Sequence, residues 1–319
     1  MAKVTVIGAT GKVGQFAAYS VSRIPFVTNI VLFGREGNED VLEGTKCDFI
    51  DSFAALGRNL DLEWSINPED LRDSDIVIIN SGVPRHKGQD RIDLAKKNAK
   101  IVANYAKMIA AYSPDSIILV VSNPVDVMTA VALKYSGFPP NRVFGLGTHL
   151  DSMRLKSFVA DHFNVHVSEV HTRIVGEHGE SMVPLWSATT IGGIQIQNLP
   201  AFSSLPKDEM VDRVRTAGLH IIEKSGATIY GPAAAISTLV RTVLGNENRI
   251  LSVSAYIKSE VHNIGDVCIG VPARLNREGA FPVPIRIDES EVTGFQQSVE
   301  KIRNVTSEIM ADLDQSMPL

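Results

Sequence analysis

A histidine placed between glycines is the side chain best suited to move a proton. His178 lies in "IVGEHGESMVP" after an apolar run, with Gly176 and Gly179 close by. An imidazole titrates near neutral pH, and the glycines would let a ligand approach it closely. The chain has eight histidines, and a single histidine is usually structural. Two interpretations therefore stand: a structural residue, or a general acid and base.

An acid and a base lie three residues apart in "GTHLDSMRLK". Asp151 and Arg154 would share one face at the start of a helix. They could form an ordinary ion pair within that helix. Alternatively, Asp151 could orient a histidine and stabilise its cation, while Arg154 binds a carboxylate through two parallel hydrogen bonds.

A short segment, "GVPRHKGQDR", gathers four possible cations in a chain whose formal net charge is −5. Arg85 and Arg91 enclose His86 and Lys87. A solvated surface loop is the simple interpretation. The other is a clamp for an anionic substrate, in which case the anion site is local.

Composition narrows the class of protein. With 319 residues, 44% of them hydrophobic, we expect about two folded domains. The acidic balance and the lack of a basic tract argue against nucleic-acid binding. No apolar run approaches the roughly 18 residues of a membrane span, and the first residues read as a strand rather than a secretory signal. Cys47 and Cys268 form no metal-ligand pattern. We therefore expect a cytoplasmic protein with unpaired thiols and no metal.

The first half alternates nearly continuous apolar runs with helical periodicity, which predicts an α/β fold with a doubly wound parallel sheet. The expected strands are residues 4–8, 30–34, 75–80 and 116–122, and the expected helices are 15–23 and 91–112. The pattern changes after about residue 148 and predicts a second, α+β domain. Its expected helices are 149–163, 208–225 and 293–314, and its expected strands are 171–176 and 282–288.

Three glycines follow the first expected strand. Gly8, Gly11 and Gly14 in "GATGKVG" open the helix that comes next. Bare glycines let the main chain approach a pyrophosphate, and the helix N-terminus supplies N–H groups. A plain tight turn is the alternative. The context favours a Rossmann-type dinucleotide-binding domain over residues 1–145, followed by a substrate domain over residues 146–319.

Two further strand ends bear on ligands. The second strand ends in "VLFGRE", where Gly34 takes the place at which NAD-binding domains often carry an acid, and Arg35 follows. This predicts that NADP is preferred and NAD also accepted, although Arg35 could be an ordinary turn residue and Glu36 could restore the acid. Asn123 in "VSNPVD" ends the last strand, where it either contacts a ligand or only begins a turn.

The chain resembles the lactate/malate dehydrogenase family over essentially its whole length. The resemblance rests on "GATGKVG", "SGVPRHKGQDR", "VSNPVD", "LDSMR" and "GEHGES", in that order. Within the family it is similar to the archaeal malate dehydrogenases that resemble lactate dehydrogenases.

The resemblance implies a role for each matched residue. His178 would carry the proton with Asp151 as its partner, Arg154 would bind the C1 carboxylate, and Arg91 would polarise the reacting carbonyl. Asn123 would contact substrate and nicotinamide, and Thr228 would offer a hydroxyl to the substrate. Arg85 falls where malate enzymes carry arginine and lactate enzymes carry glutamine. The implied cofactor contacts are Gly8, Ala9, Thr10, Gly11, Lys12, Val13, Gly14, Gly34, Arg35, Ser81, Gly82, Asn98, Val121, Ser122 and Asn123.

The implied activity is reversible hydride transfer between (S)-malate and NAD(P)+, giving oxaloacetate, a reaction of the tricarboxylic acid cycle. The dicarboxylate would be gripped by Arg154 and Arg85, under a loop that Gly82 and Gly88 allow to close. A homodimer or homotetramer is also implied. The alternatives are an L-lactate dehydrogenase and a non-catalytic NAD(P)-binding module, which would not need these charged residues together.

Overall fold

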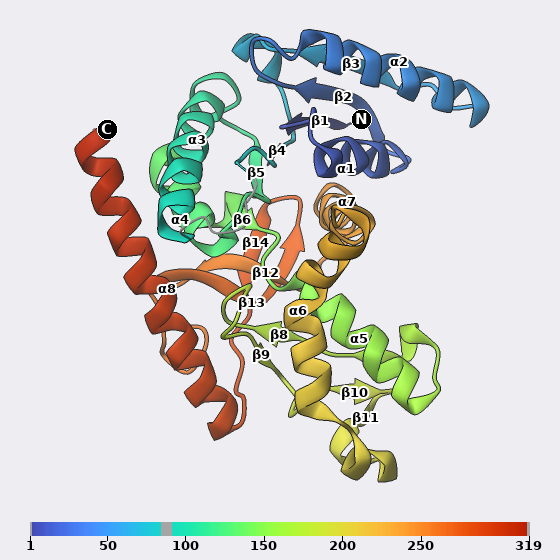
Figure 1. Ribbon diagram of the computed structural model, residues 1–319, viewed down its shortest axis with the longest axis vertical. Helices are drawn as coiled ribbons and strands as arrows, with labels where there is room; N and C mark the ends of the chain where they lie inside the picture. The colour runs from blue at the N-terminus through green and yellow to red at the C-terminus, as the bar shows by residue number, and fades with distance from the viewer. Residues whose placement is uncertain (1, 84–90, 318–319) are drawn as a thin grey trace.

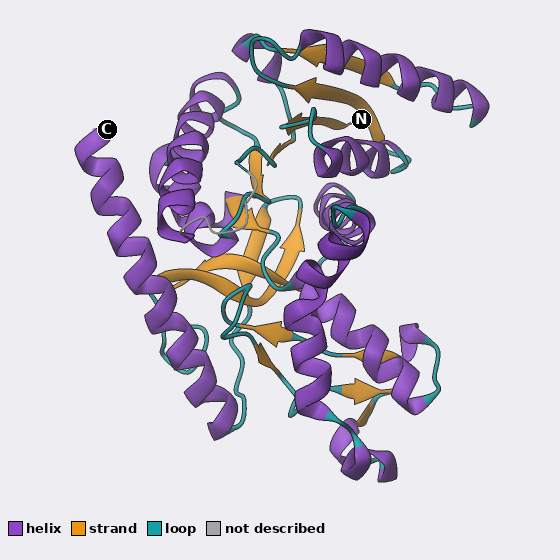
Figure 2. Cartoon of the chain, viewed as in Figure 1, coloured by secondary structure: helices purple, strands orange, loops and turns teal. Residues whose placement is uncertain are grey.

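The structure is a computed structural model that describes residues 2–83 and 91–317; the side chain of Arg91 is not described. Helices cover both faces of a central sheet (Figures 1 and 2). No helix within the described ranges is long and apolar enough to cross a lipid bilayer.

The first half builds six parallel strands. They are β1 (Ala2–Ile7), β2 (Val27–Phe33), β3 (Asp61–Ser65), β4 (Ile76–Ile79), β5 (Ile117–Val120) and β6 (Val143–Gly145). Their spatial order, β3-β2-β1-β4-β5-β6, is that of a Rossmann-type domain, whose ligands bind where the order reverses, between β1 and β4. The predicted doubly wound sheet is confirmed.

Successive side chains of a strand point to opposite sides of the sheet. Helices cover both sides here, so both faces of these strands are buried. Val6 belongs to one core cluster and Ile7 to another. On one side lie α3 (Arg91–Tyr112) and α4 (Val125–Ser136), and on the other α1 (Lys12–Ser22) with α7 (Tyr230–Leu244), as Figure 1 shows. The helix α2 (Glu39–Ala55) packs on β3. The parallel strands whose ends carry the predicted binding residues are therefore packed between helices from both halves of the chain.

The second half adds helices and antiparallel strands. The helices are α5 (His149–Phe163), α6 (Lys207–Ser225), α7 and α8 (Glu289–Ser316). Short 3₁₀ turns lie in both halves: η1 (Pro68–Leu71) and η2 (Pro140–Arg142) in the first, and η3 (Val167–Glu169), η4 (Ile196–Asn198) and η5 (Pro200–Ser204) in the second. The strands are β7 (Val170–His171), β8 (Ile174–Val175), β9 (Val183–Pro184), β10 (Thr190–Ile191), β11 (Ile194–Gln195), β12 (Arg249–Ile257), β13 (Val267–Asn276) and β14 (Gly279–Pro282).

The antiparallel meander β12–β13–β14 continues the parallel sheet. Ser254 of β12 pairs with Gly145 of β6, so the described residues form one nine-stranded sheet. An added Cβ on Gly145 would lie 3.1 Å from the Cβ of Ser254 and nearer still to Thr129, which explains the small residue at this junction. Because the sheet runs through residue 145, the division into domains at that point stays a prediction.

Two expectations for the second half need correction. The strand expected at residues 282–288 is wrong, because β14 ends at Pro282 and only Ile285 makes a further bridge. The run at 171–176 divides into β7 and β8 rather than forming one strand. The long β12–β13 pair was not expected. Pro272 lies inside β13, and a proline argues against a strand between two neighbours.

Candidate active site

The turn after β1 accepts only glycine at two positions. Gly8 has a φ of +84°, and an added Cβ would lie 2.8 Å from the main-chain oxygen of Asn80, beyond β4. An added Cβ on Gly14 would lie 2.2 Å from the oxygen of Gly8. The two glycines therefore let α1 begin against the ends of β1 and β4, at the switch point of the sheet.

The start of α1 has the donors that a pyrophosphate needs. Gly11 precedes the helix and gives it no side-chain cap, so the N–H groups of the first turn remain for a ligand. Thr10 is half-buried and Lys12 exposed, whereas Ala9 and Val13 pack into or against the core. The residues present thus fit a dinucleotide at this turn.

Asn98 ties together the ends of β4 and β5. Its side chain is buried, its Oδ1 accepts from the Val83 N–H (2.8 Å), and its Nδ2 donates to the Asn123 oxygen (2.8 Å). The Ser122 hydroxyl donates to the Ser81 oxygen (2.6 Å). These predicted cofactor contacts therefore form one connected wall, together with Gly82 against Asn98 and the buried Val121. Asn98 acts here through main-chain contacts, and its contact with cofactor stays a prediction.

The end of β2 carries Gly34 where a carboxylate is often found in NAD-binding domains, and Glu36 follows two residues later. Gly34 is buried, and an added Cβ would lie 2.7 Å from Cδ1 of Leu42. Arg35 and Glu36 are both exposed. A side chain at position 34 thus requires Leu42 to move, and the exposed guanidinium is available to a ligand.

Asp151 on α5 binds two of the predicted residues at once. It is 1% exposed; its Oδ2 lies 2.5 Å from Nδ1 of His178, and its Oδ1 accepts from Nη1 of Arg154 at 3.4 Å. The ion pair within the helix and the contact with histidine therefore coexist. His178 keeps 27% of its side chain exposed, so its ring remains accessible to a substrate.

The charge of Asp151 sets the protonation of the imidazole. It raises the pKa of His178 to about 9, against the opposing effects of burial and of Arg154. At neutral pH the ring is then a cation whose Nδ1–H donates to Asp151. Its Nε2–H is left to act on a bound oxygen.

The loop that carries His178 is anchored through its main chain. Gly176 has a φ of +89° and exchanges two hydrogen bonds with Gly270 of β13 (2.8 and 3.0 Å). The Glu177 N–H donates to Ser298 Oγ on α8 (2.6 Å), and the His178 N–H donates to Asp126 Oδ2 on α4 (2.9 Å). Sequence reasoning missed Asp126 and Ser298. For Asp126 the signal was a carboxylate inside an apolar run.

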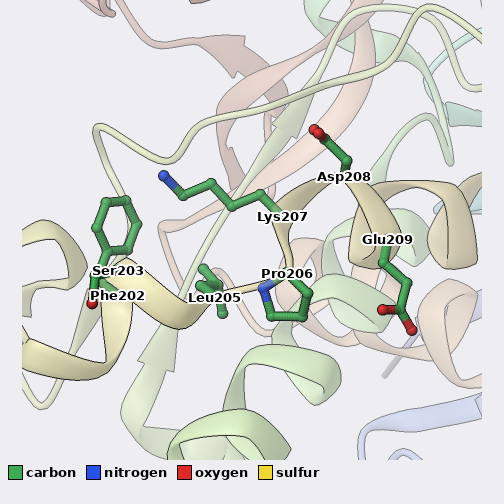
Figure 3. Close-up of a pocket in the computed structure, with 7 residues that line it drawn as sticks. All are labelled: Phe202, Ser203, Leu205, Pro206, Lys207, Asp208 and Glu209. Atoms are coloured by element: carbon green, nitrogen blue, oxygen red, sulfur yellow. The ribbon is translucent and has the colours of Figure 1, made fainter.

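The structure does not place three other predicted residues in the site. Arg85 lies outside the described residues, as do its neighbours His86, Lys87 and Gly88, and Arg91 begins α3 with its side chain undescribed. Thr228 is half-buried between α6 and α7, and its role stays a prediction. A pocket at the start of α6 (Figure 3) is lined by none of the predicted residues; its lining is Phe202, Ser203, Leu205, Pro206, Lys207, Asp208 and Glu209.

A Rossmann-type domain beside an aspartate-oriented histidine and an arginine defines a nicotinamide-dependent class of oxidoreductase. Residues 2–145 match the NAD binding domain of lactate/malate dehydrogenase, and residues 148–313 match its alpha/beta C-terminal domain. The chain belongs to the lactate/malate dehydrogenase family.

Several relatives are similar over their whole length. A malate dehydrogenase of Methanothermobacter thermautotrophicus is 48% identical, covering 99% of this chain and all of the relative. An L-2-hydroxycarboxylate dehydrogenase (NAD(P)(+)) of Methanocaldococcus jannaschii is 49% identical, covering 96% and 99%. The structure of malate dehydrogenase from Archaeoglobus fulgidus in complex with NADH has a TM-score of 0.86 at 32% identity, covering 96% and 99%.

The glycine turn generates a prediction about stability. Gly14→Ala should lower the free energy of unfolding by about 1–3 kcal/mol, because its Cβ meets main-chain atoms that cannot move independently. Gly11→Ala is the matched control, since its Cβ would have its nearest contact at 3.6 Å. Chemical denaturation without cofactor measures both. Equal stability of the two variants would contradict the packing argument.

Proposed function

We propose that this protein is a malate dehydrogenase that catalyses the reversible oxidation of (S)-malate to oxaloacetate with a nicotinamide dinucleotide. The observation that carries the proposal is the buried carboxylate of Asp151, which holds both His178 and Arg154. The names of the relatives agree with it, since malate dehydrogenases are 43–48% identical to this chain, whereas a lactate dehydrogenase of Bacillus cereus is 36% identical.

The residues divide the reaction between proton transfer and substrate orientation. Nε2 of His178 takes the C2 hydroxyl proton during malate oxidation and returns it during oxaloacetate reduction. Asp151 holds the ring in one orientation and stabilises the imidazolium. Arg154 binds the C1 carboxylate. A bound nicotinamide would supply or accept the hydride at C2.

The second carboxylate of the substrate calls for another cation. We assign it to Arg85 from the family resemblance, with Arg91 stabilising charge on the reacting oxygen and Asn123 contacting substrate and nicotinamide. Thr228 adds a hydroxyl to the pocket. A lactate dehydrogenase would have no carboxylate for Arg85 to bind, so substrate choice tests this assignment.

Arg85→Gln should cut oxaloacetate turnover strongly and improve pyruvate relative to it. Losing the partner of an enclosed carboxylate costs about 2–5 kcal/mol, which corresponds to roughly 30- to several-thousand-fold in kcat/KM. Initial rates with both keto acids, for parent and variant, measure it. An unchanged ratio would remove Arg85 from the site. Parent activity greater with pyruvate would favour a lactate dehydrogenase, and binding without turnover would favour a non-catalytic module.

The raised pKa of His178 predicts opposite pH dependence for the two directions. Oxaloacetate reduction needs the imidazolium and should fail as pH rises through about 9. Malate oxidation needs the neutral ring and should fail as pH falls through about 9. Asp151→Asn removes the charge that raises this pKa, so both profiles should move to lower pH. The pH dependence of kcat/KM measures the shift.

The role of His178 itself has a direct control. His178→Asn keeps a polar side chain of similar size but cannot carry the proton at neutral pH. Near-normal turnover in that variant, or profiles that Asp151→Asn leaves in place, would show that the proton moves through another group.

For the cofactor, we infer that NADP is preferred and NAD accepted. Gly34 offers no carboxylate to repel a 2′-phosphate, and the exposed Arg35 can donate two parallel N–H bonds to it. Nothing at this position excludes the plain ribose. The names of two relatives mention both cofactors or NAD alone: the Methanocaldococcus jannaschii dehydrogenase is named with NAD(P)(+), and the Archaeoglobus fulgidus structure contains NADH.

Parent kcat/KM should favour NADPH over NADH by about five- to 150-fold, since a charge-assisted contact contributes about 1–3 kcal/mol, and the preference should shrink at high salt. Arg35→Ala should remove the preference. Gly34→Asp with Arg35→Ile should reverse it, although the new side chain must displace Leu42. Glu36→Gln is the control. If Glu36→Gln instead lowers kcat/KM with NADH, then Glu36 rather than Arg35 contacts the ribose.

We also propose a cytoplasmic homo-oligomer, a dimer or a tetramer. The described cysteines, Cys47 and Cys268, are free thiols, as suits a reducing compartment. Tyr230 is 74% exposed and packs edge-on against Phe16, which leaves aromatic surface on α1 and α7 for a second copy. Sedimentation velocity that finds a monomer at micromolar concentration would contradict the oligomer.

A further inference from the structure

A second carboxylate contacts the main chain of the residue that carries the proton. Asp126 is 2% exposed and is the second residue of α4, three residues after Asn123. Its Oδ2 accepts from the His178 N–H at 2.9 Å. Its Oδ1 is buried with no hydrogen-bond partner among the described residues. Burial of an ionised group in this way is costly and calls for a reason.

The neighbouring peptide shows that a charge is not required for the contact itself. The Glu177 N–H is bound at 2.6 Å by the neutral hydroxyl of Ser298. A hydroxyl or an amide oxygen could accept the His178 N–H equally well. The carboxylate of Asp126 therefore adds something that a neutral acceptor would not, namely a negative charge beside the imidazole.

The charged and titratable groups around Asp126 come from several elements. His178 and Glu177 face it from the loop, and Cys268 faces it from β13. Glu177 is itself paired with Lys301 of α8 (2.8 Å). Beyond the imidazole stand Asp151 and Arg154. Two buried carboxylates therefore act on His178: Asp151 contacts the ring directly, and Asp126 contacts the main chain and acts on the ring through its charge.

The surroundings of Asp126 bring its pKa close to neutral pH. Burial raises its pKa to about 6, and Ser254 and His178 oppose that rise. Among the described residues the Ser254 hydroxyl has no partner within hydrogen-bond distance, yet it is near enough to Asp126 to favour the ionised carboxyl. At neutral pH the carboxyl is then largely ionised, and its charge in turn favours the imidazolium of His178.

We propose that Asp126 is a positioning residue that fixes the main chain of His178 relative to Asn123 and, through its charge, strengthens the hold of the imidazole on its proton. The chain connects these roles directly, because Asn123 and Asp126 are separated by only two residues at the start of one helix. The proposal rests on the proposed function in one respect, which is that His178 carries the proton.

Three variants of the full chain separate charge from position. Asp126→Asn keeps an acceptor for the His178 N–H but loses the charge, so the His178 pKa should fall and both pH profiles should move to lower pH. Asp126→Ala loses both, so kcat at the new optimum should also fall roughly tenfold. Ser298→Ala, the matched control, removes a neutral anchor of the adjacent peptide and should leave the His178 pKa in place.

The His178 pKa is measured by NMR titration of its ring without cofactor or substrate, and the pH profiles are measured in parallel. An unchanged His178 pKa in Asp126→Asn, or an equal fall in Ser298→Ala, would overturn the proposal. If the Asp126 variants fail to fold, Ser254→Ala should lower the His178 pKa by favouring protonated Asp126, and no change would again overturn it. A shifted ring titration in a protein without malate turnover would overturn the proposed function alone.

Discussion

The short contact between Asp151 and His178 is the interaction on which the rest of the site depends. It joins Asp151 of α5 to a loop residue that lies 27 positions further along the chain. A buried carboxylate without a partner would be costly, so the contact also stabilises the local fold. The same Asp151 carboxylate both orients the imidazole and favours its protonated form, so the position and the charge of the ring depend on one contact.

The anchors around the loop explain how a segment that follows a two-residue strand can hold His178 in one position. The main chain of residues 176 to 178 is hydrogen-bonded to the backbone of β13 and to side chains of α8 and α4. Each of these elements has its own buried face. The ring is thereby oriented from both ends, by Asp151 at Nδ1 and by the backbone contacts. Such support from several elements limits the motion of the loop more than any single contact could.

Much of this arrangement was accessible from the sequence, and the missing part has a physical reason. The runs that became β1, β2, β4 and β5 are continuous and apolar, and α3 and α5 have the residue bounds that helical periodicity predicted. Asp151 and Arg154 were paired correctly because their contact is local. Asp126 accepts from the His178 N–H, 52 residues away, and Ser298 accepts from the Glu177 N–H, 121 residues away. No local sequence pattern predicts contacts between residues so far apart. The strand β13 was not predicted, and Pro272 within it is a residue that a strand between two neighbours rarely contains.

The same sheet brings the two halves of the site together. Parallel strands place the glycine turn, Ser81 and Asn123 at one edge, and β12 extends that sheet from β6 into the part of the chain that carries the loop. Asn123 and Asp126 lie on either side of the start of α4, so a shift of the end of β5 would move the acceptor of the His178 N–H with it. The distance between the strand ends of the first half and the loop that carries His178 is therefore set by main chain and by the buried carboxylate of Asp126.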